Sequence, residues 1–226
     1  MNNQKPDSGT SFSPMVYLLV GLVLLCMIAA AYLVLTKAET DKTRHGSATG
    51  EIKFDDDLVS NASPEQDFSS LMLTDSAGKE IYLKDFVGKS NLVFVVLRGY
   101  SYAVCPYCSA QTQRVINRYD EIKEQDANVV IAYPLNGRGD RDKLDLFIAA
   151  ANRGTGLTND ELPLTLGVDF ELKVVDALGI RADLSKPATY ILDKSGKLRF
   201  AYVGDSLSDR PSVNAIINQL KQINGE

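Results

Sequence analysis

The chain has 226 residues, of which 45% are hydrophobic and 23% charged, proportions typical of a globular protein with room for one domain and a tail. Its formal net charge of −5 argues against nucleic acid as a partner, because binding to nucleic acid usually needs a basic surface. Only three cysteines are present, which excludes a small domain held together by disulfides.

An apolar segment without any charged residue runs from Met15 to Leu35, after a short N-terminal tail at residues 1–14. A helix needs about 20 such residues to cross a bilayer, so the segment predicts a transmembrane helix. The alternative is a cleaved signal peptide ending at Ala29-Ala30-Ala31, but the apolar region of such peptides is usually about 7–15 residues long. Because apolar residues continue past the three alanines, we expect an uncleaved single-pass anchor.

The next segment, residues 36–66, is polar, rich in small residues and without sustained periodicity, which predicts a flexible linker. The folded domain is expected at 67–226, where apolar strands alternate with helices. The expected elements are a hairpin at Leu71–Leu83, a strand at Asn91–Leu97, a helix at Ser109–Gln125, a strand at Asn128–Leu135, a helix at Asp140–Asn152, a strand at Leu164–Val168, a helix at Glu171–Leu178, strands at Ala188–Asp193 and Lys197–Val203, and a helix at Pro211–Ile223. This alternation predicts an α/β fold with a central mixed sheet covered on both faces by helices.

Between the first long strand and the helix after it lies Cys105-Pro106-Tyr107-Cys108. The start of a helix presents unpaired backbone N–H groups and the positive end of the helix dipole, which favour a thiolate at Cys105. Cys108 is one turn further on the same face, where it can attack a mixed disulfide formed at Cys105. Pro106 suits the first helical turn and stiffens the loop, and Tyr107 is expected to shape the approach of a substrate.

Three features together resemble the thioredoxin-like superfamily over about residues 67–224. They are the strand, Cys-Pro-Tyr-Cys, helix order, the run Lys186-Pro187-Ala188-Thr189-Tyr190-Ile191-Leu192-Asp193, and the Phe86-x-Gly88-Lys89 turn. The third feature, with Leu162-Pro163 and Ala177-x-Gly179-Ile180, is similar to the redoxin branch that includes alkyl hydroperoxide reductase and thiol-specific antioxidant proteins.

The resemblance implies that Pro187 is in cis beside the dithiol and that the backbone next to it, at Lys186, pairs with a bound peptide or thiol substrate. A trans proline opening a strand is the alternative. Two departures from thioredoxins stand out: Val104 replaces the tryptophan before the first cysteine, and the preceding strand carries no buried acid but ends at Arg98-Gly99. Proton transfer to Cys108 by a carboxylate is therefore not expected.

The first functional hypothesis is a membrane-tethered thiol-disulfide oxidoreductase that acts on protein thiols and disulfides or small thiols, with an unidentified electron donor or acceptor and no cofactor. The second is a peroxidase that reduces hydroperoxides through Cys105. Peroxiredoxins carry Pro-x-x-x-Thr/Ser-x-x-Cys, whereas Tyr102 stands three residues before Cys105, and they keep an arginine where this chain has Pro187. Arg98 remains a candidate to stabilise a thiolate.

Two further hypotheses are not enzymatic. A zinc site would need Cys26 and His45 to complete four ligands with the dithiol, one from the apolar segment and one from the linker, so no metal is expected. The other hypothesis is an assembly module in which the Cys-x-x-Cys is incidental, although exposed cysteines of low pKa are hard to keep unreactive.

The side of the membrane that the domain faces depends on two opposed arguments. Lys5 precedes the apolar segment, whereas Lys37, Lys42 and Arg44 follow it, which by the positive-inside rule favours a cytoplasmic domain. A tethered dithiol domain, however, suits a compartment in which disulfides form and persist. We expect the extracytoplasmic, periplasmic side. The direction of electron flow stays open, because Pro-Tyr between the cysteines does not determine a reduction potential.

Overall fold

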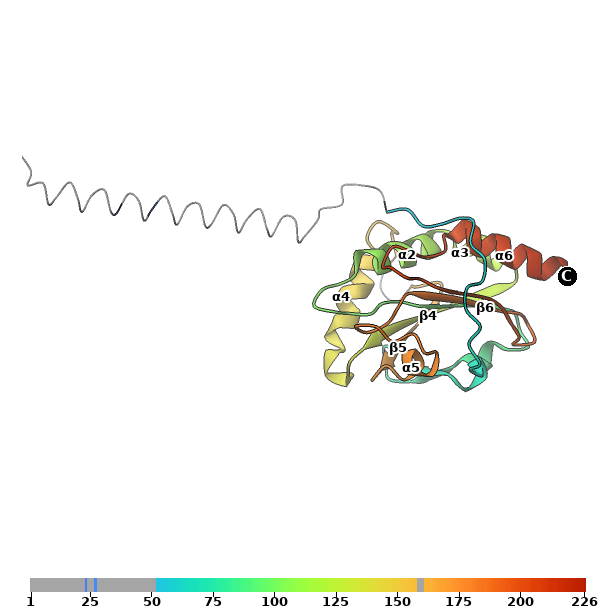
Figure 1. Cartoon of the computed structure of the whole chain (residues 1–226), viewed down its shortest axis with the longest axis horizontal. Coiled ribbons are helices and arrows are strands. Elements are labelled where there is room, and N and C mark those ends of the chain that lie inside the picture. Colours follow the sequence, from blue (N-terminus) through green and yellow to red (C-terminus); the bar gives the residue numbers. More distant parts are fainter. Residues whose placement is uncertain (1–22, 24–26, 28–51, 158–160) are drawn as a thin grey trace, which may run out of the picture. The chain divides into compact units, whose positions relative to one another are not determined.

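The computed structural model describes residues 23, 27, 52–157 and 161–226 (Figure 1). The chain divides into two compact units, Met1–Glu51 and Ile52–Glu226, and every element that follows belongs to the second. Among the residues that the structure describes, no helix has the length and apolar character needed to cross a membrane. The predicted anchor at 15–35 lies outside the described residues except for Val23 and Met27, so it stays a prediction.

A seven-stranded mixed sheet forms the centre of the domain, in the order β2-β1-β5-β4-β3-β6-β7. The central strands β3, β4 and β5 run parallel, and β6, β7, β1 and β2 extend the sheet by antiparallel pairing. The strands are β1 (Met72–Thr74), β2 (Glu80–Tyr82), β3 (Asn91–Val96), β4 (Ala127–Leu135), β5 (Thr165–Phe170), β6 (Ala188–Leu192) and β7 (Leu198–Val203). All six residues of β3 are buried, because a central strand covered on both faces meets no solvent.

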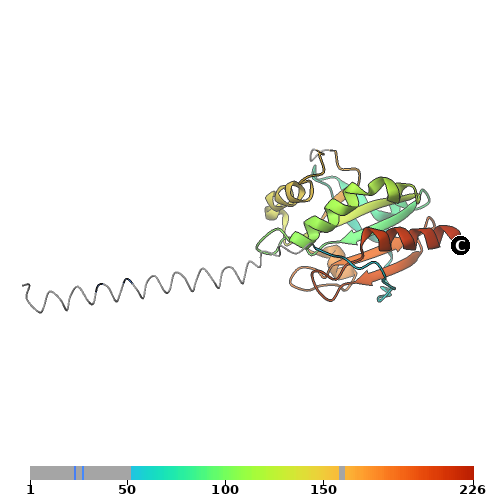
Figure 2. The same cartoon turned by 90° about the horizontal axis from the view of Figure 1, so that it is seen from above.

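Helices cover both faces of the sheet (Figures 1 and 2). The α-helices are α2 (Pro106–Asn117), α3 (Tyr119–Lys123), α4 (Asp142–Ala151), α5 (Lys173–Ala177) and α6 (Val213–Gly225), and the 3-10 helices are η1 (Phe68–Ser70), η2 (Leu83–Phe86) and η3 (Arg138–Asp140). On one face, α2, α4 and α6 pack in a core cluster with Val93 and Val95 of β3. On the other, η1 and α5 pack with Phe94 and Val96. The strand's alternation therefore builds two cores, and the predicted α/β thioredoxin-like arrangement is confirmed.

The helix after the dithiol differs from the predicted single helix at Ser109–Gln125. It begins earlier, at Pro106, and α2 ends at Asn117 because Arg118 leaves the helical region with φ −121° and ψ 22°. The guanidinium of Arg118 binds Glu121 and Asn214 of α6, and α3 starts at the next residue. Apolar spacing continues across this break, so the sequence pattern alone could not reveal it.

Residues 52–66, here called the strap, do not form the flexible linker expected up to residue 66. The N–H of Asp55 donates to the carbonyl of Arg210 at 3.0 Å, and the carbonyl of Asp55 accepts from the N–H of Ser212 at 2.8 Å. Further along, the side chain of Asn61 both donates to and accepts from the backbone of Val203 in β7. The strap thus covers the edge of β7 and belongs to the same compact unit as the sheet, Ile52–Glu226. Residues 36–51 lie outside the described residues.

Candidate active site

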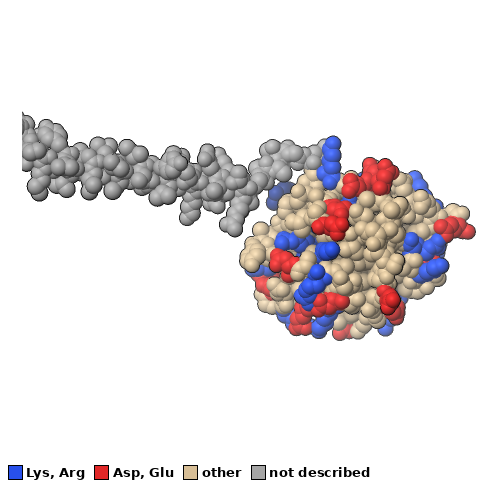
Figure 3. Space-filling view, viewed as in Figure 1, with Lys and Arg blue, Asp and Glu red and all other residues tan. Residues whose placement is uncertain are grey.

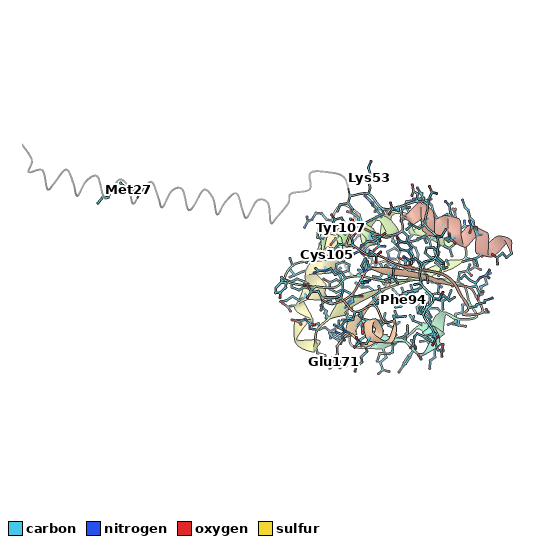
Figure 4. The ribbon with its side chains drawn as sticks, in the orientation of Figure 1. Met27, Lys53, Phe94, Cys105, Tyr107 and Glu171 are labelled. Carbon is cyan, nitrogen blue, oxygen red and sulfur yellow. The ribbon has the colours of Figure 1, made fainter. Side chains whose placement is uncertain are left out.

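The two cysteines lie at the start of α2, as their spacing predicts. Figure 4 labels Cys105, with Tyr107 nearby. Cys105 is the N-cap residue, with an extended backbone at φ −69° and ψ 118°, and Pro106 is the first helical residue. The N–H of Cys108 donates to the Sγ of Cys105 at 3.4 Å. A sulfur therefore takes the place of the oxygen that usually caps a helix, which favours negative charge on Cys105. Neither of these two cysteines is in a disulfide bond in the structure.

The loop between β3 and α2 is held against β4 by Gly99. This residue has φ +86°, and a Cβ added to it would lie only 2.2 Å from the carbonyl oxygen of Pro134. Only glycine fits such a left-handed position with a neighbouring backbone so close. Further along the loop, Tyr102 also has a positive φ, and its side chain is 96% exposed next to the dithiol in sequence.

The two thiols differ in acidity. The pKa of Cys105 is lowered from its ordinary value near 9 to about 6, chiefly because the thiol of Cys108 donates a hydrogen bond to it, with backbone N–H groups and the charge of Arg210 assisting against burial. The pKa of Cys108 is raised well above its ordinary value, first by complete burial and then by the same hydrogen bond to Cys105. Cys105 is consequently the thiolate and Cys108 the protonated partner in the reduced protein.

Arg210 is a part of the site that the sequence analysis missed. It lies between β7 and α6, is only 1% exposed, and donates through Nη2 to the Sγ of Cys108 at 3.4 Å. Its other donors bind Gln111 Oε1 of α2 and the carbonyl of Leu207, both at 2.7 Å. In the sequence it stands in Ser-Asp-Arg-Pro-Ser, a polar run that indicates a surface turn, so no local signal identifies it.

Arg98 and Lys186, predicted to contribute to the site, make their ion pairs elsewhere. The guanidinium of Arg98 binds Asp183 at 2.9 Å, and only its backbone N–H reaches the Cys108 sulfur, an interaction that lowers the pKa of that thiol. Lys186 lies 3.7 Å from Asp205 in an exposed ion pair. In the part of the chain that the structure describes, no side-chain hydrogen bond joins Arg98 or Lys186 to either cysteine.

The prediction of a cis peptide bond before Pro187 is wrong, because the bond is trans. Pro187 precedes β6, where its missing N–H needs no partner in the sheet, and its carbonyl accepts from the N–H of Gly204 at 2.8 Å. The backbone N–H of Lys186 is also used, since it donates to Ile180. Pro187 is therefore a trans proline that opens a strand.

A groove of about 390 Å³ opens beside Cys105, between the first turns of α2 and the end of α4. It is mainly lined by small and apolar side chains, with one cation at its rim. The lining residues are Val104, Pro106, Ser109, Ala110, Gln113, Ala150 and Arg153. On the other side of the same loop, Tyr100 and Tyr102 line a second hollow of about 280 Å³. Tyr107, predicted to shape substrate approach, packs partly buried against the core of the α2 face.

The described residues contain no group of three or more side chains arranged to hold a metal ion. Cys26 and His45, which the zinc hypothesis would need, lie outside the described residues. Around the domain, Lys and Arg side chains are interspersed with Asp and Glu on the face that Figure 3 shows.

The fold is similar to that of several peroxiredoxins of known structure. The mitochondrial 2-Cys peroxiredoxin of Plasmodium falciparum aligns with a TM-score of 0.55 and 13% identity over 74% of this chain and 94% of its own. Peroxidoxin BcpB of Mycobacterium tuberculosis aligns with a TM-score of 0.52 and 17% identity, over 72% of this chain and 99% of its own. Peroxiredoxin Q of Xanthomonas campestris aligns with a TM-score of 0.51 and 14% identity, over 73% of this chain and 98% of its own.

At these identities the structural likeness concerns the fold. Among curated proteins, none has a sequence that matches this chain. The model of the AhpC/TSA family, however, matches residues 64–201, which include β1 to β6 and the whole dithiol loop. This match covers more than half of the chain and contains both cysteines. The chain therefore belongs to the AhpC/TSA family of redoxins.

Proposed function

We propose that the protein is a thiol-disulfide oxidoreductase that exchanges disulfides with protein thiols or small thiols through Cys105 and Cys108. The observation that carries the proposal is the difference between the two sulfurs. Cys105 caps α2 and has a pKa of about 6, whereas Cys108 is a buried thiol of raised pKa. The backbone nitrogen of Cys108 lies 3.4 Å from the Cys105 sulfur. Cys105 is thus available as the nucleophile, and Cys108 stays protonated until a mixed disulfide has formed.

The exchange follows from this arrangement in either direction. As reductant, the Cys105 thiolate attacks a partner disulfide and releases one partner thiolate. Cys108 then gives its proton to water, attacks the Cys105 sulfur and releases the second partner thiolate. As oxidant, a partner thiolate attacks Cys105 in the Cys105–Cys108 disulfide, and Cys108 leaves as a thiolate. A second partner thiol then releases Cys105. The groove at Val104, Pro106 and Ala110 offers apolar surface for the partner next to the reacting sulfur.

Substitution of each cysteine tests this proposal. Cys105→Ser should abolish disulfide exchange with a dithiol substrate, because the remaining thiol is buried. Cys108→Ser should instead accumulate mixed disulfides at Cys105, visible by non-reducing electrophoresis and mass spectrometry. Full multi-turnover exchange by Cys108→Ser would show that Cys108 does not resolve the intermediate.

A second candidate function is the reduction of hydroperoxides, favoured by the family match and the Cys105 thiolate. In this reaction the thiolate takes the terminal oxygen of the hydroperoxide and releases an alcohol, and Cys108 then displaces water from the sulfenic acid to form the same disulfide. Arg210 binds the sulfur of Cys108 instead of Cys105, which speaks against a peroxide pocket. Single-turnover rates with hydrogen peroxide and with a disulfide distinguish the two functions, and we expect the disulfide to react faster.

We further propose that residues 15–35 anchor the protein in a membrane and that the redox domain faces the extracytoplasmic side. The support is the uncharged apolar run in the sequence and the chemistry of the dithiol. Alkaline extraction of membranes should leave the full-length protein in the pellet. Protease added to intact spheroplasts should digest the domain, whereas protection from protease would place it in the cytoplasm.

A further inference from the structure

We propose that Arg210 serves as the built-in counter-ion of the Cys108 thiolate in the second step of exchange, so that the Cys108 proton can pass to water without a carboxylate base. The inference rests on the proposed function, because it concerns the step in which Cys108 attacks or leaves. Arg210 should also shift the reduction potential of the Cys105–Cys108 disulfide, which the Cys-Pro-Tyr-Cys motif alone does not determine.

Arg210 carries a buried positive charge that no carboxylate of the described residues neutralises. Arg210 is 1% exposed, yet its described partners are the neutral Gln111 amide, the neutral Leu207 carbonyl and the Cys108 sulfur. Among the ion pairs of the described residues none involves Arg210. The adjacent carboxylate of Asp209 accepts instead from the hydroxyl of Tyr202 and the N–H of Asp205. A buried guanidinium is costly without an anion, and a thiolate is the anion that this pocket can generate.

The charge on the two sulfurs changes in a definite order during exchange. In the reduced protein the negative charge rests on Cys105, and this charge and its hydrogen bond are among the causes that keep the pKa of Cys108 high. Once Cys105 is bound covalently to a partner, that charge is gone. The guanidinium of Arg210 and the backbone N–H of Arg98 then act against burial alone, so the pKa of Cys108 falls at the stage at which its attack is required.

The same contact biases the equilibrium of the protein's own disulfide. Oxidation converts the Cys105 thiolate and the Cys108 thiol to a disulfide with the loss of two electrons and of the Cys108 proton, and it removes the negative charge of Cys105 from the neighbourhood of Arg210. Reduction restores an anion to the pocket. Arg210 therefore stabilises the reduced form and makes the disulfide more oxidising than it would be without the charge.

A two-phase reaction of the reduced full-length protein with an aromatic disulfide tests the inference. Attack by Cys105 releases one coloured thiolate, and resolution by Cys108 releases the second. In Arg210→Gln we expect the second phase to slow at least tenfold at neutral pH while the first changes less, since Arg210 binds Cys108 directly. Arg210→Lys, which keeps the charge, should restore much of the second phase. The matched control is Arg199→Met, a partly buried arginine paired with Asp193 and Glu226.

The equilibrium constant against dithiothreitol supplies a second readout. Arg210→Gln should shift it about tenfold toward the disulfide, which corresponds to about 30 mV for two electrons. Arg199→Met should leave it unchanged. If both phases occur in Arg210→Gln at wild-type rates and the equilibrium constant does not move, the inference is overturned while the proposed function stands. If the wild-type protein shows no first phase, the proposed function itself fails.

A measurement on the wild-type protein keeps the test decisive should Arg210→Gln not fold. The rate of the second phase depends on the fraction of Cys108 thiolate, so its pH profile reports the acidity of Cys108 in the mixed disulfide. The inference requires a midpoint at or below the ordinary pKa of a cysteine thiol, about 9, and a higher midpoint overturns it. The other titratable or charged groups around the sulfurs are Tyr100, Tyr133 and the Arg98–Asp183 pair. Burial raises the pKa of Tyr133 well above its ordinary value, so its hydroxyl stays neutral in this range.

Discussion

Burial separates the chemistry of two cysteines that share one helical turn. Cys105 keeps 4% of its surface exposed and accepts a hydrogen bond from the thiol of Cys108, whereas Cys108 has no exposed surface, lies in the core cluster with β3 and contacts Arg210. In a buried pair that shares one proton, the hydrogen bond stabilises the thiolate of one residue and the thiol of the other. The spacing of the motif allows this division, and the packing decides which sulfur receives which role.

The reactivity of Cys105 should therefore depend on pH with a midpoint near 6. Alkylation of the reduced protein by iodoacetamide should rise as the pH increases through that value and then reach a plateau below the range in which ordinary thiols ionise. Peptide mapping of the alkylated protein should locate the label at Cys105. A midpoint near 9, or preferential labelling of Cys108, would contradict the assignment of the nucleophile.

The stability of the reduced protein should also depend on the ionisation of Cys105. The folded-state pKa of Cys105 lies below its unfolded value, so its contribution is fully present above about 9 and is lost as the pH falls through about 6. Between these values the free energy of unfolding of the reduced protein should rise relative to the oxidised protein, with a slope approaching about 1.4 kcal/mol per pH unit. Urea titrations of both forms at several pH values measure it. A constant difference between the two forms would refute the shift.

At the scale of elements, the turn from β3 into α2 is what presents the dithiol. β3 is buried along its whole length, and the chain leaves it through Gly99, whose backbone touches Pro134 of the parallel neighbour β4. Because the end of β3 is fixed in this way, the first turn of α2 begins at a defined position above the sheet. The loop can then expose Tyr102 while Cys108 stays inside.

Gly99→Ala should destabilise the domain by roughly 3 kcal/mol, because it combines a left-handed backbone with a clash against a carbonyl of β4. Gly88→Ala is the matched control: Gly88 has a similar φ of +81°, but nothing lies within 4 Å of the added Cβ. That substitution should cost only the backbone strain, about 1 kcal/mol. Chemical denaturation of both variants measures the difference, and equal effects would show that the contact with Pro134 is not restrictive.

At the scale of the whole molecule, the strap joins the N-terminal side of the domain to the active site. Asp55 pairs through its backbone with Arg210 and Ser212, the residues that flank the entry to α6. Asn61 closes the exposed edge of β7 at Val203. The strap thus holds in place the segment that delivers Arg210 to Cys108, although the two cysteines lie about fifty residues further along the chain.

A fragment that starts at Asp67 should accordingly be less stable than one that starts at Ile52. The loss of several strap hydrogen bonds is worth on the order of 3 kcal/mol, or about 10 °C in Tm. Because Arg210 loses its backbone support, the shorter fragment should also have a more negative reduction potential. Differential scanning calorimetry and dithiothreitol titration measure the two effects. Equal values for both fragments would indicate that the strap does not position Arg210.

Short-range patterns in the sequence are sufficient to predict the α/β alternation, the position of nearly every strand and the dithiol at a helix start. Each depends on residues close together in the chain, as in β3 and in the Cys105 cap. The split of the dithiol helix at Arg118, the trans bond at Pro187 and the strap were decided by distant partners, which no local pattern reports.

Arg210 shows the physical reason most directly. It is separated from Cys108 by 102 positions and looks like part of a polar surface turn in the sequence. The guanidinium of Arg210 is removed from water and contacts the Cys108 sulfur only when β7 and α6 pack beside α2. Local interactions decide which segments become strands and helices, whereas the desolvation that gives a charge or a thiol its function arises from tertiary packing alone.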